Sequence, residues 1–335
     1  RTQISKVLPL MRHDGGMKLV RLLLRVLLFV TGSVTYALLN VFSELSKSSN
    51  GKYAYSMPTV VCLAEFVKLV LSLLFLSREK GVVSALKKLL STSPRTWLLF
   101  SVPSILYATN NTLDMYNTQF MDPATGSVLV QLKILTTGVA MRMVFKTRLG
   151  PLKWASLVLL FVGCACAGWP ATSAEELGNM YIKPVGVLLI MLYATLSASA
   201  GVYMEWLYKR DDGKSESIHV CNARIYSVGC LFLLCVHLLS PQPDLNLCRG
   251  YNVYTWALVV TYSIMGLVLA QVMKFFDNFV KLFISGSSIY VSAILTATLF
   301  GRSPSLLFCQ SMAIVTLAIV LYNYDKLHLL KSKSS

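Results

Sequence analysis

The sequence contains few charged residues and very few of the side chains that carry acid–base or metal chemistry. Of its 335 residues, 14% are charged, only 15 are Asp or Glu, and the 4 histidines are scattered along the chain. It has no G-x-x-x-x-G-K-[ST] segment, which argues against an ATPase of the P-loop class. Neither a metal site nor a Ser-His-Asp arrangement is indicated. We therefore expect a protein that is not an enzyme and uses no cofactor.

The spacing of the cysteines does not indicate a disulfide framework. Most of the 8 cysteines lie inside apolar runs, and they lack the paired spacing of zinc ligands, so we expect buried thiols rather than disulfides or zinc sites. The net charge of +16 could suggest a nucleic-acid partner. However, the basic residues lie mainly between apolar segments, where membrane orientation explains them, and we expect no nucleic-acid partner.

What the sequence has in excess is apolar residues. A hydrophobic content of 55% and a mean hydropathy of +0.61 place it among multi-span membrane proteins whose partner is the lipid bilayer. Ten runs are long enough to cross about 30 Å of hydrocarbon. The predicted spans are residues 19–42, 57–77, 96–118, 124–145, 152–170, 184–208, 218–240, 252–274, 278–300 and 305–324. We expect an all-α membrane protein with a ten-helix domain at 19–325, between tails at 1–18 and 326–335.

The basic residues predict how the chain is oriented. Lys and Arg gather in the tails and in the loops after even-numbered spans, and they are rare in the other loops, which predicts that both termini are cytosolic. Residues 80–92 are expected to form a short amphipathic helix on the cytosolic face. An overlay of residues 107–169 on 262–324 aligns two Phe-x-Asp segments, at Phe120 and Phe275. This offset predicts two inverted five-helix repeats, at about 19–170 and 184–325.

The residue that most needs an explanation is Lys133, which is expected about halfway along the span 124–145. No acidic residue lies within a helical turn of it. A cation at the centre of a bilayer-spanning helix costs about 3 kcal/mol on insertion scales, so it faces a partner or a water-filled cavity. Two interpretations stay open: Lys133 pairs with Glu65 or Glu205 in the fold, or it binds an anionic ligand.

Other charged residues inside the predicted spans suggest ion pairs. Glu65 and Lys68 are three residues apart on one helical face, which predicts a structural pair, and Arg224 is a second candidate partner for Glu65. Near the junction of spans eight and nine, an acidic residue can satisfy one of two lysines, and the other lysine would then converge with Lys133 from the opposite half. These three residues are Asp277, Lys274 and Lys281.

Aromatic and amide side chains accompany these lysines. Isolated lysines suit phosphoryl oxygens, while tyrosines can stack on a base and amides can read its polar edges. The amides could equally hold helices together, and the small residues of span six could simply permit close packing. The candidates are Tyr107, Asn110, Asn111, Gln131, Ser199, Tyr203, Tyr226 and Asn278.

Four motifs together resemble a known family. They are Tyr107…Asn110-Asn111 with Asp122-x-Ala124, the run Gln131-Leu-Lys-Ile-Leu-Thr-Thr137, Ala200-Gly-Val-Tyr-x-Glu205, and Lys274-x-x-Asp-Asn-x-x-Lys281. This set resembles the nucleotide-sugar transporters for CMP-sialic acid, UDP-galactose and UDP-N-acetylglucosamine, within the drug/metabolite transporter superfamily.

The resemblance implies both a function and roles for individual residues. It implies a ten-helix antiporter of the Golgi or endoplasmic reticulum that imports a UDP- or CMP-sugar into the lumen in exchange for the nucleoside monophosphate. It also implies that Lys133 and Lys274 are phosphate ligands, that Tyr107 and Asn111 contact the base, and that Tyr226 lies near the phosphate. A homodimer and contacts with glycosyltransferases are further partners consistent with it.

The chain departs from the family pattern in span four. Many members have an aromatic residue followed by Gln where this chain has Gly126-Ser127, and a tyrosine where it has Val130. The missing aromatic wall removes a stacking surface worth about 1–3 kcal/mol per base. Two alternatives therefore remain: a carrier of another organic phosphate, and a non-transporting scaffold or chaperone of glycosyltransferases.

The C-terminal segment offers a targeting signal. Lys331-Ser-Lys333-Ser-Ser has the K-x-K-x-x form of a dilysine retrieval signal, which would work on a cytosolic tail. A basic anchor beside the membrane is the alternative.

Overall fold

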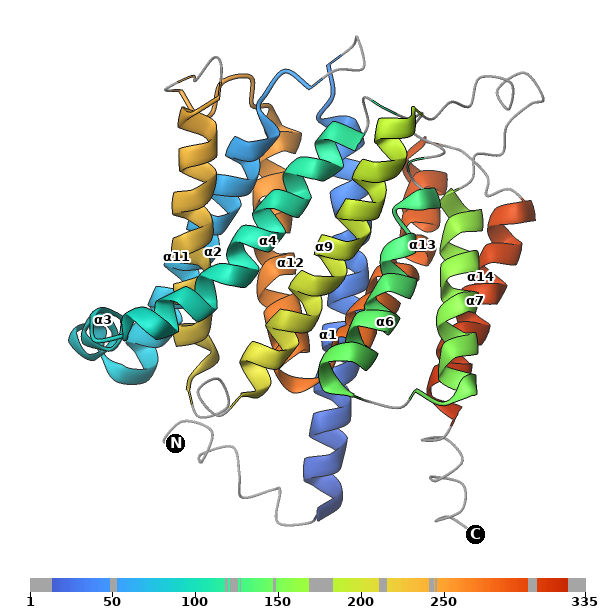
Figure 1. The fold of residues 1–335 in the computed structure, drawn as a ribbon, viewed down its shortest axis with the longest axis horizontal. Coiled ribbons are helices and arrows are strands. Elements are labelled where there is room, and N and C mark those ends of the chain that lie inside the picture. Colours follow the sequence, from blue (N-terminus) through green and yellow to red (C-terminus); the bar gives the residue numbers. More distant parts are fainter. Residues whose placement is uncertain are drawn as a thin grey trace.

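The computed structural model is a bundle of α-helices, with no strand among the residues it describes (Figure 1). The described residues are 14–48, 53–117, 120, 126, 128–146, 149–168, 183–210, 216–240, 244, 246–300 and 306–324. The predicted dilysine signal and most of both predicted tails lie outside these residues.

Among the described residues, an α-helix overlaps each of the ten predicted spans in whole or in part. These helices are α1 (Asp14–Leu45), α2 (Met57–Lys80), α4 (Pro94–Asn117), α6 (Leu132–Phe145), α7 (Pro151–Gly168), α9 (Pro184–Lys209), α11 (Ile218–Leu238), α12 (Val253–Phe275), α13 (Asn278–Phe300) and α14 (Leu306–Tyr322). Proline opens several of them, where its missing N–H has no helical partner to lose. At α12, Asn252 and Thr255 form a capping box.

Five described helices combine the length and the apolar character needed to cross a membrane. These segments are Leu23–Ser43, Met57–Glu79, Pro184–Lys209, Ile218–Leu238 and Val253–Phe275, and α7 and α14 provide shorter apolar helices. In α4 and α13, polar residues such as Asn110 and Lys281 lower the mean hydropathy, and both of these residues line an internal cavity. The chain is thus a helical membrane protein, as its composition predicted.

The short helix predicted at 80–92 is present as α3 (Val82–Leu90). Gly81 separates it from α2 with a φ of +79°, a conformation that glycine adopts without steric cost. The turn sends α3 sideways from the bundle at the lower left of Figure 1. Val82, Val83 and Leu90 on α3 are exposed.

The fourth predicted span is less regular than expected. Regular helix begins at Leu132, and a tighter turn precedes it, in which the amide of Gln131 donates to the carbonyl of Val128 (3.1 Å). Valine has a lower helix propensity than leucine, which fits a turn at Val130 and Gln131. Lys133 therefore lies in the first turn of α6, and not halfway along one continuous helix.

Helices from the two halves of the chain interlock. Helix α7 packs on α14 and α2 packs on α11, while α1 contacts α12 and α13 and α9 contacts α4 and α6. The largest buried cluster accordingly combines residues from both halves, including Leu157 and Leu160 with Phe279 and Phe283. The halves share one core.

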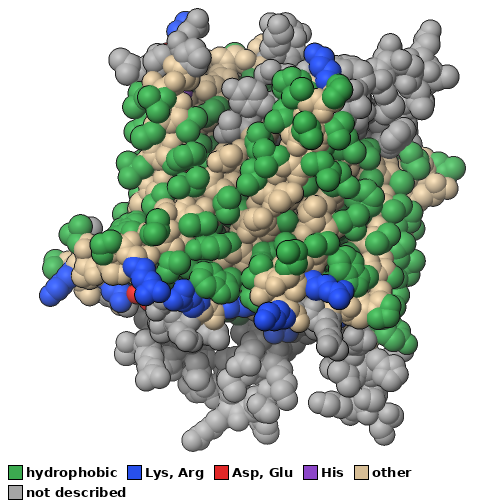
Figure 2. Space-filling view, viewed as in Figure 1, with side chains coloured by type: hydrophobic (Ala, Val, Ile, Leu, Met, Phe, Trp, Pro, Cys, Tyr) green, Lys and Arg blue, Asp and Glu red, His purple; other side chains and the backbone are tan. Residues whose placement is uncertain are grey.

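One end of the bundle is basic. In Figure 2, apolar side chains cover most of the visible face, and Lys and Arg side chains form a band along its lower edge. Helix α1 begins and α14 ends at this same end (Figure 1). We call it the basic end; α9 ends there with Lys209, and α12 ends there with Lys274.

Candidate binding cavity

A central cavity of about 1370 Å³ lies between helices of both halves. Ser43 near the end of α1, Pro58 at the start of α2 and Ser240 after α11 all line it. These three residues lie at the end of the bundle opposite the basic end, so the cavity extends from the interior toward that opposite end.

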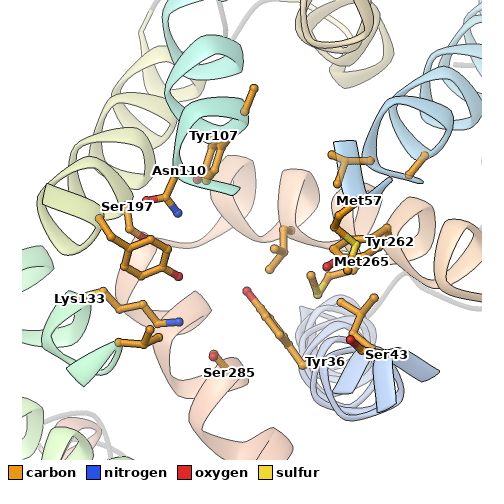
Figure 3. A pocket seen from close by; sticks show the side chains of 18 of the residues that line it. Tyr36, Ser43, Met57, Tyr107, Asn110, Lys133, Ser197, Tyr262, Met265 and Ser285 are labelled. Carbon is orange, nitrogen blue, oxygen red and sulfur yellow. The ribbon is translucent and has the colours of Figure 1, made fainter. Parts of the chain in front are cut away.

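Two lysines from different halves line this cavity. Lys133 of α6 points into it, toward Tyr36 and Ser285 (Figure 3). Lys281 of α13 donates a hydrogen bond to the hydroxyl of Tyr107 (3.2 Å), and its ammonium lies 5.0 Å from the centroid of that ring. Within the part of the chain that the structure describes, no carboxylate lies within 4 Å of either ammonium. Both cations are therefore unneutralised in the cavity.

The two carboxylates suggested as partners of Lys133 are paired with other lysines. Glu65 pairs with Lys68 at 2.6 Å, as their spacing predicted, and the Lys68 ammonium lies 4.5 Å from the centroid of the Tyr226 ring. Glu205 pairs with Lys209 and also accepts a hydrogen bond from the backbone amide of residue 278 (2.7 Å). The suggested pairing of Lys133 with Glu65 or Glu205 is therefore wrong.

At the junction of α12 and α13, the lysine that lines the cavity differs from the expected one. Lys274, in the last turn of α12, points to the basic end and donates to the backbone oxygen of Glu216 (2.7 Å). Asp277 neutralises neither lysine at this junction, because its carboxylate accepts from the amide of Val280 (2.9 Å) and caps α13. Lys281, one turn into α13, thus lines the cavity in place of Lys274.

Of the other predicted site residues, some line the cavity and some do not. Several line the cavity: Tyr107, Asn110, Gln131, Tyr226 and Asn278. Ser199 and Tyr203 are not among the described lining residues; Ser197 on the same helix lines the cavity instead, while Tyr203 packs on Trp206 with ring centroids 5.2 Å apart. The side chain of Asn111 lies outside the described residues.

Arg224 also has a different partner from the one suggested. Its guanidinium pairs with Glu216 and not with Glu65. Arg224 lies near the start of α11, close to the basic end, whereas Glu65 sits beside Gly229 further along that helix. Position along α11 therefore decides the pairing.

Two buried amides in the wall lack a partner. The Oδ1 atoms of Asn110 and Asn278 are buried, and no described residue donates to them. An unsatisfied buried acceptor costs about 1–3 kcal/mol. A ligand or water that donates hydrogen bonds in the cavity would remove this cost.

Sequence reasoning missed Tyr36. This residue of α1 lines the cavity, and its hydroxyl points toward Lys133 in Figure 3. A search of the first span for polar aromatic residues would have found it. Gly126 and Val130, two of the positions that depart from the family pattern, line the same cavity, whereas Ser127 is outside the described residues. Tyr36 thus places an aromatic ring in the cavity that Gly126 and Val130 also line.

The fold and the cavity together define a helical membrane protein with an internal site suited to an anionic solute. The model of the nucleotide-sugar transporter family matches residues 17–323, and the chain belongs to that family, as its motifs predicted.

Three relatives illustrate the range of names within the family. The chain is 30% identical over 291 residues to CMP-sialic acid transporter 1 of Arabidopsis thaliana, covering 84% of each chain. It is 30% identical to a probable UDP-sugar transporter protein of Xenopus tropicalis (82% of this chain, 84% of the relative) and to the UDP-N-acetylglucosamine transporter of Rattus norvegicus (90% and 94%). A solved crystal structure with 13% identity matches 91% of this chain and 98% of its own with a TM-score of 0.66, which supports the fold alone.

Proposed function

We propose that the protein is an antiporter that carries a UDP- or CMP-sugar across the Golgi or endoplasmic-reticulum membrane in exchange for the nucleoside monophosphate. The observation that carries this proposal is the pair of unneutralised ammonium groups of Lys133 and Lys281 in one cavity. Relatives named for CMP-sialic acid and UDP-sugars support the nucleotide class.

The charge balance of the cavity favours a phosphorylated cargo. Among the described residues that line the cavity, Glu65 pairs with Lys68, and Asp244 pairs with Arg249 nearby. Lys133 and Lys281 then remain as two excess positive charges. The anionic groups of a nucleotide sugar would neutralise these two ammonium groups. If the transporter cannot change conformation while the cavity is empty and both cations are unpaired, each return step needs a bound anion. Transport is then an exchange.

Individual roles follow from position. Lys133 lies in the first turn of α6, where its ammonium can bind phosphate as a point charge. Lys281 supplies the second cation. Tyr107 and Tyr36 offer rings to the base, and the amide residue Asn110 lines the same cavity.

We also propose that the ten helices form two inverted repeats, residues 19–170 and 184–325. Helix packing supports this. In the proposed repeats α1 corresponds to α9, α4 to α12 and α6 to α13. The contacts of α1 with α12 and α13 then correspond to the contacts of α9 with α4 and α6. By the positive-inside rule the basic end faces the cytosol, which would place both termini there.

A binding screen tests the function and identifies the base. Thermal unfolding of the purified protein would be followed with UMP, CMP and GMP, and a ligand at a hundredfold excess over Kd stabilises by about 2.7 kcal/mol. Stabilisation by one nucleotide that disappears in Lys133→Ala supports the proposal. A protein that no nucleotide stabilises would instead be a scaffold for glycosyltransferases or a carrier of another organic phosphate.

A further inference from the structure

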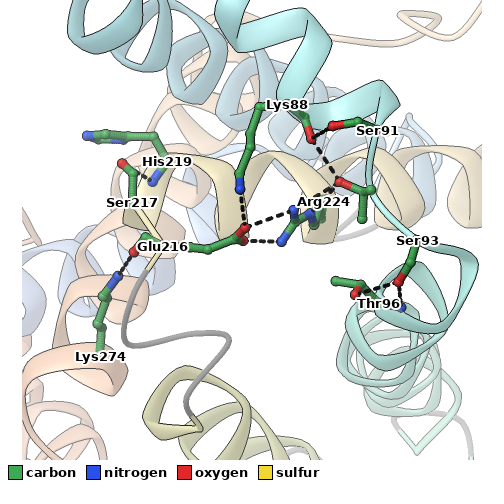
Figure 4. Close-up of polar contacts among 10 residues, drawn as sticks. Lys88, Ser91, Ser93, Thr96, Glu216, Ser217, His219, Arg224 and Lys274 are labelled. Atoms are coloured by element: carbon green, nitrogen blue, oxygen red, sulfur yellow. Dashed lines mark hydrogen bonds and ion pairs between the residues drawn. The ribbon is translucent and has the colours of Figure 1, made fainter.

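A polar cluster at the basic end is centred on Glu216, in the non-helical segment before α11. Its carboxylate accepts hydrogen bonds from Lys88 of α3 (3.0 Å) and from both terminal nitrogens of Arg224. Its backbone oxygen accepts from Lys274 of α12 (2.7 Å), as Figure 4 shows. Arg224 also donates to Thr92, between α3 and α4 (2.9 Å). One residue therefore ties α3, α11 and α12 together.

A buried apolar layer separates the cluster from the cavity. Ile225 and Met273 line the cavity, and they directly follow Arg224 and precede Lys274 in the chain. These two residues belong to a buried apolar layer that also contains Phe100 and Tyr208. The cations of the cluster thus lie on the side of this layer away from the cavity, toward the basic end.

The charges of the cluster are unbalanced. Among the residues that the structure describes, three cations, Lys88, Arg224 and Lys274, surround one carboxylate. The neighbouring described acid, Glu79, is turned to Ser217 (2.7 Å) and His219 (3.6 Å). Burial opposes ionisation of Glu216, but hydrogen bonds from Arg224 and Lys88 outweigh it and hold the pKa of this carboxyl below its usual range. The site therefore favours an anion where Glu216 lies.

Arginine binds carboxylate and phosphate oxygens with the same forked geometry. Arg224 contacts both oxygens of Glu216 in this way, and its residue is only 3% exposed. Glu216, by contrast, is outside any helix. It can leave the cluster without breaking helical hydrogen bonds, whereas Arg224 and Lys274 are fixed on α11 and α12.

We propose that Arg224, Lys88 and Lys274 form a capture site for the phosphate groups of the nucleotide sugar at the basic end, and that Glu216 occupies this site as an internal substitute for phosphate. The inference rests on the proposed function. An arriving diphosphate displaces the carboxylate, and because Glu216 ties α3, α11 and α12 together, its displacement opens this end of the bundle. Capture of cargo is thereby linked to opening toward the side from which the cargo comes.

Exchange measured from each face of the membrane tests this proposal. The variants would be reconstituted in liposomes whose protein orientation is established by tag accessibility, and the KM for UMP would be measured at each face. Glu216→Gln keeps the side-chain size but removes the competing charge, so KM at the basic face should fall, by about fivefold if the pair has the strength of a partly exposed ion pair. KM at the opposite face should not change.

Two further variants complete the test. Lys88→Gln alters a lysine whose side chain is 44% exposed, so folding should be preserved, and KM should rise at the basic face alone. Glu79→Gln removes a nearby negative charge that contacts no cation of the capture site and should leave both faces unchanged. If Glu216→Gln alters neither face, or both equally, the capture site is refuted while the function stands. A wild-type protein that exchanges no nucleotide refutes both.

Discussion

The ammonium group of Lys281 lies 3.2 Å from the hydroxyl of Tyr107, although 174 residues separate the two in the chain. The contact joins α13 to α4, which come from opposite halves, across the wall of the central cavity. It places a cation and an aromatic ring at one point, as a site for a phosphorylated base requires. The first prediction follows from this pair.

Replacing Lys281 should affect nucleotide binding more than replacing Lys274 does. Lys281→Ala removes a charge-assisted contact worth about 1.5–3 kcal/mol, so the thermal stabilisation by nucleotide should weaken accordingly. Lys274→Ala should weaken nucleotide binding less, because this lysine contacts the backbone of Glu216 outside the cavity. Equal losses in the two variants would contradict the assignment.

Tyr36 should contribute a stacking surface. Tyr36→Ala is expected to weaken nucleotide binding by about 1–3 kcal/mol, whereas Tyr36→Phe, which keeps the ring, should bind nearly as well as wild type. Tyr254, which is 42% exposed on α12 and outside the cavity, provides a matched control. Titration of each variant by thermal shift would measure the difference, and a loss in Tyr36→Phe as large as in Tyr36→Ala would show that the hydroxyl matters instead.

Gly266 should tolerate no side chain. A Cβ atom there would lie 2.5 Å from Cδ of Lys68 and would push this lysine away from Glu65 and from the Tyr226 ring. Overpacking of this kind costs about 1–3 kcal/mol, so the melting temperature of Gly266→Ala should fall. At Gly150 a Cβ atom would meet nothing within 4 Å, and Gly150→Ala should unfold like wild type.

Cys62 and Cys230 should form a disulfide under oxidation. Their sulfur atoms lie 3.9 Å apart, on α2 and α11, and closing the bond at about 2.05 Å needs only a small shift. A membrane-permeant thiol oxidant should produce the cross-linked peptide in mass spectrometry, and Cys62→Ser should abolish it. Failure to cross-link the wild-type protein would argue against the packing of α2 on α11.

The Glu216 cluster should make stability depend on acid. Because the pKa of Glu216 is lower when folded than when unfolded, its stabilisation is complete above the unfolded value of about 4.3 and is lost as pH falls through the folded value. Wild type should therefore melt above Glu216→Gln at neutral pH, and the gap should close below about pH 4. A gap that stays constant with pH would mean that charge is not its cause.

Much of the fold could be predicted from the sequence. Among the described residues, a helix overlaps each of the ten apolar runs, and α3 appears where an amphipathic segment follows Gly81. Hydropathy and proline positions act locally, so they can be read residue by residue. The break before Leu132 could not be predicted in this way, because weak helix formers such as Val, Thr and Gly occur on both sides of it.

The candidate site was predictable only in part. The sequence by itself determined that Lys133 has no local counter-charge, since no acid lies within a turn of it, and that Glu65 can reach Lys68. Only the tertiary structure decided that Lys281 lines the cavity instead of Lys274, that Arg224 pairs with Glu216, and that Tyr36 faces Lys133. The physical reason is that each of these outcomes depends on where a helix ends and how it is rotated against helices from the other half, and packing between distant segments sets both.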